Sequence, residues 1–177
     1  MALNLPGEIK EKLAVYLEDL ERQNLGIKWV NPEGLHLTLH FLGYLDERKI
    51  EEVKSMTEGL SGKFGRMDFS LNRLDSFPNL ARPRIIFLEA KQAGDQTVFD
   101  LQELLGLELI KLKIDIDDRP WRSHLTLGRV KLPDQVLRLQ QDLKILPLDF
   151  SVSSFELMES ELTPAGARYK EVLSCRL

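Results

Sequence analysis

The chain carries the stretch LHLTLHFL at residues 35–42, and its HLTL segment at 36–39 recurs at 124–127, 88 positions later (124 − 36 = 88). In both copies leucines alternate with polar residues, which is the period-two pattern of a β-strand with one buried face. The two copies therefore predict two strands, each of which presents a histidine and a threonine on one face and leucines on the other.

A helical interpretation of the first copy would have a different chemical meaning. His36 and His40 are four residues apart, and on a helix they would share a face as metal ligands do. On a strand that rises about 3.3 Å per residue, they are roughly 13 Å apart and could not bind the same ion. The leucine alternation favours the strand, so we predict neither a metal nor another cofactor.

The rest of the chain alternates predicted helices with predicted strands. Helices are expected at 7–23, 46–60, 95–107 and 133–143, and strands at 28–30, 35–42, 69–74, 84–89, 123–130, 148–159 and 168–176. Each half has a helix, a motif strand and a second helix. This order predicts an α+β fold in one domain, residues 1–177, with two similar lobes related by pseudo-two-fold symmetry. Each lobe would be an antiparallel sheet with helices outside, and a cleft would separate the lobes.

Composition narrows the classes of function. The formal net charge of −4 argues against sequence-independent binding to duplex nucleic acid, but it leaves room for a pocket that takes a phosphate or an RNA end. The single cysteine excludes an intramolecular disulfide. No apolar stretch could span a membrane, and the start lacks the features of a signal peptide. We expect a cytoplasmic protein, monomeric and without an obligate protein partner.

Several blocks of the chain resemble the two-histidine (2H) phosphoesterase superfamily, and within it the RNA 2′,3′-cyclic phosphodiesterases, also called ThpR or LigT-like 2′–5′ RNA ligases. These blocks are KWV at 28–30 before LHLTLHFLG at 35–43, FP at 77–78 with RPR at 82–84, SHLTLGR at 123–129, and ELTPAG at 161–166 through Tyr169. Members of the family usually begin with a full apolar strand, whereas here only Ala2-Leu3-Asn4 precedes Leu5-Pro6.

The resemblance implies a metal-independent enzyme that hydrolyses 2′,3′-cyclic phosphate ends of RNA, or cyclic nucleotides, to 2′-phosphates. It assigns His36 as the proton donor to the leaving 3′ oxygen and His124 as the base that activates water. Imidazoles can fill both roles near neutral pH, and the hydroxyls of Thr38 and Thr126 can stabilise the phosphate in the transition state. Two alternatives are open. The same site run in reverse would ligate RNA 2′–5′, and a catalytically silent module would only bind RNA or nucleotides.

Arg129 is a further candidate for binding phosphate, because a guanidinium group matches phosphate oxygens and the family carries an arginine at this position of the motif. However, Arg129 is five residues after His124 and would point to the opposite face of a regular strand. A β-bulge, or the end of the strand, would turn the Arg129 side chain to the histidine face.

Other residues near the motifs have less specific interpretations. Basic side chains could form a rim for RNA, although each is individually more typical of a solvated surface: Lys28, Arg82, Arg84, Arg119 and Arg122. Trp29, Phe41 and Trp121 could stack on a base, but core packing is favoured, above all for Phe41 on the leucine face. His40 is predicted to be non-catalytic, either at the edge of the site or paired with a neighbour.

Overall fold

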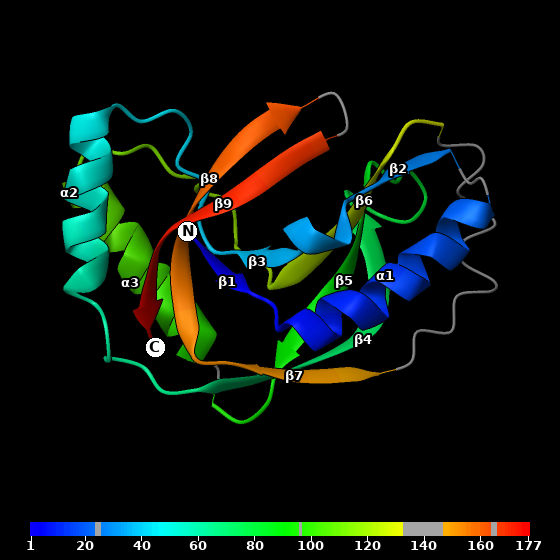
Figure 1. The fold of residues 1–177 in the computed structure, drawn as a ribbon, viewed down its shortest axis with the longest axis horizontal. Coiled ribbons are helices and arrows are strands. Elements are labelled where there is room, and N and C mark those ends of the chain that lie inside the picture. The colour runs from blue at the N-terminus through cyan, green and yellow to red at the C-terminus, as the bar shows by residue number, and fades with distance from the viewer. Residues whose placement is uncertain (24–25, 96, 133–146, 164–165) are drawn as a thin grey trace.

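The computed structural model describes residues 1–23, 26–95, 97–132, 147–163 and 166–177, which form a mixed α+β fold (Figure 1). The helices are α1 (Gly7–Arg22), α2 (Glu47–Glu58) and α3 (Thr97–Lys111), with a 3-10 turn η1 (Pro32–Gly34). The strands are β1 (Ala2–Asn4), β2 (Ile27–Trp29), β3 (His36–Thr38), β4 (Met67–Phe77), β5 (Ile85–Gln92), β6 (His124–Val130), β7 (Leu148–Val152), β8 (Ser154–Thr163) and β9 (Gly166–Arg176). The helix predicted at 133–143 lies outside the described residues.

The strands form one antiparallel sheet in the order β7-β4-β5-β6-β3-β1-β8-β9, and β2 pairs with β6. Figure 1 shows β1 and β3 in the middle of the molecule, with α1 on one side and α2 and α3 on the other. The predicted α+β class with antiparallel strands is confirmed. The short segment Ala2–Asn4 is a strand of this sheet, between β3 and β8. The pseudo-two-fold symmetry of the lobes and the cleft between them stay predictions.

The first motif strand is shorter than its alternation predicts. It ends at Thr38, whose carbonyl accepts a hydrogen bond from the indole Nε1 of Trp121 at 3.0 Å. The chain then turns toward α3, where the Nε2 of His40 bonds the carbonyl of Gln102 at 2.7 Å. Phe41 follows this turn and is 74% exposed, so the prediction that it packs in the core is wrong. Beyond Thr38 the backbone leaves the sheet, so the period-two pattern no longer predicts which side chains are buried.

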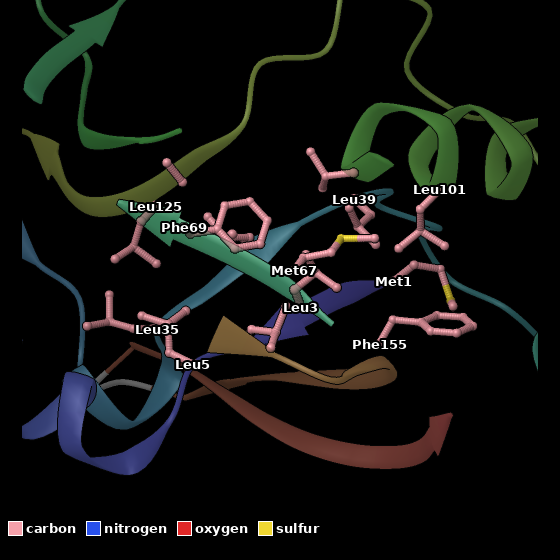
Figure 2. Close-up of a cluster of buried hydrophobic side chains, with 14 of the residues drawn as sticks. Met1, Leu3, Leu5, Leu35, Leu39, Met67, Phe69, Leu101, Leu125 and Phe155 are labelled. Carbon is pink, nitrogen blue, oxygen red and sulfur yellow. The ribbon is translucent and has the colours of Figure 1, made fainter. Parts of the chain in front are cut away.

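The leucine face of both motif strands belongs to the main hydrophobic core. Leu37 and Leu125 are fully buried there, together with residues that recur at helical spacing in α1 and α3: Ile9, Leu13, Leu17, Leu20, Val98, Leu101, Leu105 and Leu109. Figure 2 shows Leu3, Leu125, Phe69, Leu101 and Phe155 of this cluster, which come from five different elements. No described helix has both the length and the apolar character needed to cross a membrane.

Candidate active site

The two motif strands are hydrogen-bonded neighbours, with Leu37 directly opposite Leu125. In an antiparallel pair this register places His36 opposite Thr126 and Thr38 opposite His124, on the face away from the leucines. Side chains directly opposite have Cβ atoms about 5 Å apart, and diagonal ones about 7–8 Å apart. The four residues therefore form a square with the histidines on one diagonal and the threonines on the other. Pairing of β3 with β6 therefore places the polar residues of both motifs side by side.

A hydrogen bond between Nδ1 and a backbone carbonyl orients each of the two motif imidazoles. The Nδ1 of His36 bonds the carbonyl of Gly34, and the Nδ1 of His124 bonds the carbonyl of Arg122, each at 2.7 Å. A carbonyl oxygen can only accept, so Nδ1 must carry the proton in both rings. Neither Nε2 has a hydrogen bond to another described residue, which leaves Nε2 of each histidine as the nitrogen that can exchange protons with a ligand.

His36 is held between the turn before it and the last strand of the sheet. The side chain of Asn31 caps η1 by accepting from the amide of Glu33, and this turn presents the carbonyl of Gly34. The ring of Tyr169, in β9, contacts the imidazole edge to face with centroids 4.5 Å apart. A Cβ on Gly34 would lie 3.0 Å from the same tyrosine ring, so the glycine lets Tyr169 approach closely.

His124 is held by aromatic residues of β4 and β5. Its ring centroid lies 5.0 Å from that of Phe77 and 5.2 Å from that of Phe87, edge to face in both cases. The guanidinium carbon of Arg122 lies 5.3 Å from both phenylalanine centroids, and its Nη2 bonds Asp75 at 3.3 Å. The edge-to-face contacts fix the plane of the imidazole, and the ion pair holds Arg122 beside it.

Burial lowers the pKa of both histidines below the ordinary value of 6.5. The hydrogen bonds from Nδ1 to the backbone carbonyls raise the pKa of both histidines and so oppose this shift. The positive charge of Arg122 lowers the pKa of His124 further. Both imidazoles are therefore neutral at neutral pH in the free protein. A bound phosphate anion would favour the protonated form of either ring.

A β-bulge returns Arg129 to the histidine face. Ile86 of β5 pairs with Gly128 and Phe87 pairs with Thr126, so Leu127 is an extra residue in β6. Leu127 and Gly128 therefore both face the core side. A Cβ on Gly128 would lie 2.6 Å from the side chain of Ile27, which explains why this position is a glycine. Because of the bulge, Arg129 points to the same side as His124 and Thr126.

The remaining candidate residues from the sequence analysis occupy several different places in the fold. Trp121 packs edge to face on Phe99 with centroids 5.2 Å apart, and Trp29 packs against Ile86; both are partly buried, in line with the packing role predicted for them. His40 is 5% exposed and is paired with the Gln102 carbonyl, one of the two placements predicted for it. Among the basic residues, Arg122 lies beside His124 and Lys28 lies opposite Arg129.

Arg119 pairs with Asp117, and Arg82 and Arg84 are exposed. Sequence reasoning missed the aromatic residues that pack on the histidines. Phe77 and Tyr169 belong to the blocks that resemble the family, but nothing local showed that their strands flank the motifs.

Comparison with known proteins supports the resemblance to this phosphoesterase family over the whole chain. Residues 3–87 match the family model described as LigT like Phosphoesterase. An RNA 2′,3′-cyclic phosphodiesterase of Thermotoga maritima is 30% identical over 177 residues, which cover 99% of this chain and 93% of the relative. An RNA 2′,3′-cyclic phosphodiesterase of Methanothermobacter thermautotrophicus is 29% identical, with 100% of this chain and 97% of the relative covered.

Solved structures show the same fold. A protein of Thermus thermophilus superimposes with a TM-score of 0.76 and 28% identity, covering 99% of this chain and 95% of that one. Escherichia coli LigT complexed with 3′-AMP has a TM-score of 0.79 at 20% identity, with the same coverage of 99% and 95%. The paired motif strands, the antiparallel sheet and the full-length relatives agree, and the chain belongs to the LigT-like phosphoesterase family.

Proposed function

We propose that this protein is an RNA 2′,3′-cyclic phosphodiesterase that opens cyclic phosphate ends to 2′-phosphates. The observation that carries the proposal is the square on β3 and β6, in which two imidazoles share a diagonal and neither Nε2 atom bonds another described residue. The names and the full-length coverage of the relatives support the same activity. The substrates are RNA termini or cyclic nucleotides, and the protein acts in the cytoplasm as a single bilobal domain and a monomer.

The square can carry out the hydrolysis in one displacement. The Nε2 of His124 accepts a proton from water while the water oxygen forms a bond to phosphorus. The bond from phosphorus to the 3′ oxygen breaks, and the Nε2 of protonated His36 donates its proton to that oxygen. The product has a 2′-phosphate and a 3′-hydroxyl, and the enzyme is left with the two protonation states exchanged, which solvent restores.

The two threonines, on the other diagonal of the square, stabilise the negative charge that develops on the phosphate. The hydroxyls of Thr38 and Thr126 donate hydrogen bonds to its non-bridging oxygens, and Arg129 adds a positive charge on the same face. Donors placed before the reaction begins need no reorganisation in the transition state. No step in this scheme requires a metal ion, so the activity should persist in EDTA.

A single assay tests the proposal. A short RNA with a 2′,3′-cyclic phosphate is incubated with the protein in EDTA, and the product is identified as a 2′- or 3′-phosphate. His36→Ala and His124→Ala should each reduce kcat by at least about a hundredfold, the usual contribution of a general acid or base.

The third histidine provides the matched control. His40→Gln can keep a donor to the Gln102 carbonyl and should retain most of the activity. Full activity in either alanine variant would contradict the proposal. Addition of an RNA with a 5′-hydroxyl detects 2′–5′ ligation by the same site, and wild-type protein that binds without turnover would identify a silent binding module.

A further inference from the structure

The two motif histidines obtain their neighbouring cations from different parts of the chain. In the second motif, Arg122 accepts the Nδ1–H of His124 with its carbonyl and also supplies the positive charge beside that imidazole. In the first motif, the residue two before the histidine is Gly34, which has no side chain to carry a charge. Tyr169 leaves no room for one, because a Cβ at Gly34 would lie 3.0 Å from the tyrosine ring. A cation beside His36 therefore has to come from another element.

Lys10, near the start of helix α1, supplies this cation. The helix packs against the turn η1, and the Nζ of Lys10 donates a hydrogen bond to the carbonyl of Glu33 at 2.7 Å. Glu33 directly precedes Gly34, whose carbonyl accepts the Nδ1–H of His36. The ammonium thus holds the peptide unit next to the one that orients the imidazole.

The charge of Lys10 acts on the same histidine. Burial is the largest cause of the lowered pKa of His36, and the positive charge of Lys10 contributes to it. The pKa of Lys10 is itself lowered by burial, against the charges of Glu33 and Glu156. Among the residues that the structure describes, no carboxylate forms an ion pair with Lys10, whose bond goes to a carbonyl instead. A single bond of this kind offsets little of the cost of ordering and partly burying a lysine, so a role in the site accounts for this placement better than a role in stability.

We infer that Lys10 is a positioning residue for His36: its ammonium fixes the turn η1, and the Gly34 carbonyl of that turn holds the imidazole with Nε2 toward the phosphate. This inference rests on the proposed phosphodiesterase function. Lys10 acts through the turn and needs no contact with the substrate. Without the ammonium, the Gly34 carbonyl can move away from Nδ1, and a small misplacement of the acid slows proton transfer to the leaving oxygen.

The direct test removes the ammonium and keeps an apolar side chain of similar length. Nitrogen NMR of the histidine side chains in Lys10→Met, at a pH where both rings are neutral, reads the tautomer of each ring. We expect His36 to populate the form protonated on Nε2, while His124 in the same sample stays protonated on Nδ1. Lys10→Arg keeps a cation that can donate to the Glu33 carbonyl, and it should restore the wild-type tautomer.

Kinetics on a short RNA with a 2′,3′-cyclic phosphate separate positioning from binding. Lys10→Met should lower kcat about tenfold, a part of the factor of about a hundred or more that a general acid supplies, and should change KM by less than about twofold. Lys12→Met is the matched control. Lys12 is an exposed lysine two residues further along the same helix, on a different face, and its loss should change neither constant.

The outcomes distinguish the positioning role from the function on which it rests. An unchanged His36 tautomer in Lys10→Met would overturn the positioning role, as would a loss of the tautomer in both histidines, which would show a general effect on the fold. A higher KM with unchanged kcat would also overturn it and would identify Lys10 as a direct ligand of the substrate. Wild-type protein that hydrolyses no cyclic phosphate would overturn the proposed function, and the tautomer measurement would still decide the role of Lys10.

Discussion

Backbone carbonyls set the tautomer of each motif histidine. Each imidazole donates Nδ1–H to the carbonyl two residues before it, Gly34 for His36 and Arg122 for His124. The bond sets the tautomer and the ring orientation without a carboxylate partner. As a result the two rings have the same tautomer in the free protein. Their surroundings differ, with Tyr169 beside His36 and with Phe77, Phe87 and Arg122 beside His124.

The lowered pKa values make the pH dependence predictable. Since burial lowers the pKa of both histidines below 6.5, the free enzyme has one protonated and one neutral imidazole mainly on the acid side of that value. The kcat/KM profile should be bell-shaped with its maximum below pH 6.5 and should fall as the pH rises further. Measurement of kcat/KM across the acid and neutral range checks this, and a maximum on the alkaline side of neutrality would contradict it.

Arg122 shows which limb of that profile belongs to His124. Its cation contributes to the lowered pKa of His124, so Arg122→Gln should raise that pKa and move one limb to higher pH. The other limb, which belongs to His36, should stay in place. A parallel shift of both limbs would mean that the substitution acts on the fold as a whole.

At the scale of elements, the bulge in β6 determines which side chains share the histidine face. Gly128→Ala would place a Cβ 2.6 Å from Ile27 and 2.9 Å from Trp29, and 3.1 Å from the backbone oxygen of Lys28. Strand β2 must then move, and we expect the free energy of unfolding to fall by about 1–3 kcal/mol, as for other overpacked sites. Denaturant unfolding measures this directly.

Gly65 serves as the control for that substitution. A Cβ at Gly65 meets nothing within 4 Å, so Gly65→Ala should change the free energy of unfolding by less than about 0.5 kcal/mol. If Gly128→Ala were equally neutral, the packing of β2 against β6 described above would be wrong.

The sequence predicts strands better than it predicts where they end. Alternating leucines identified both motif strands and their buried face, because burial of one face is a local property of the pattern. The end of β3 depends on Trp121, which is 83 residues away in the chain and bonds the Thr38 carbonyl. Phe41 continues the alternation in the sequence but lies past that point, which is why the pattern misplaced it.

At the scale of the whole molecule, the sheet order joins parts that are remote in sequence. Strands β3 and β6 are neighbours, β1 and β8 flank them on one side, and β5 and β4 on the other. Tyr169 of β9 and Phe77 of β4 contact the histidines although their strands are not hydrogen-bonded neighbours of the motif strands. The repeated motif predicted two strands that each present a histidine and a threonine on one face, because these residues repeat in the sequence itself, and the strands are hydrogen-bonded neighbours. It could not predict the aromatic residues around them, because strand order depends on long-range pairing.

In the mechanism proposed above, one phosphate lies between His36 and His124 and contacts Nε2 of both. Nitrogen NMR of the histidine side chains during titration with a 2′-nucleotide, the product of the proposed reaction, tests it most directly. We expect the pKa values of His36 and His124 to rise together on binding while both Nδ1 atoms stay protonated, and His40 not to respond. A response from only one of the two motif histidines, or from neither, would contradict the claim.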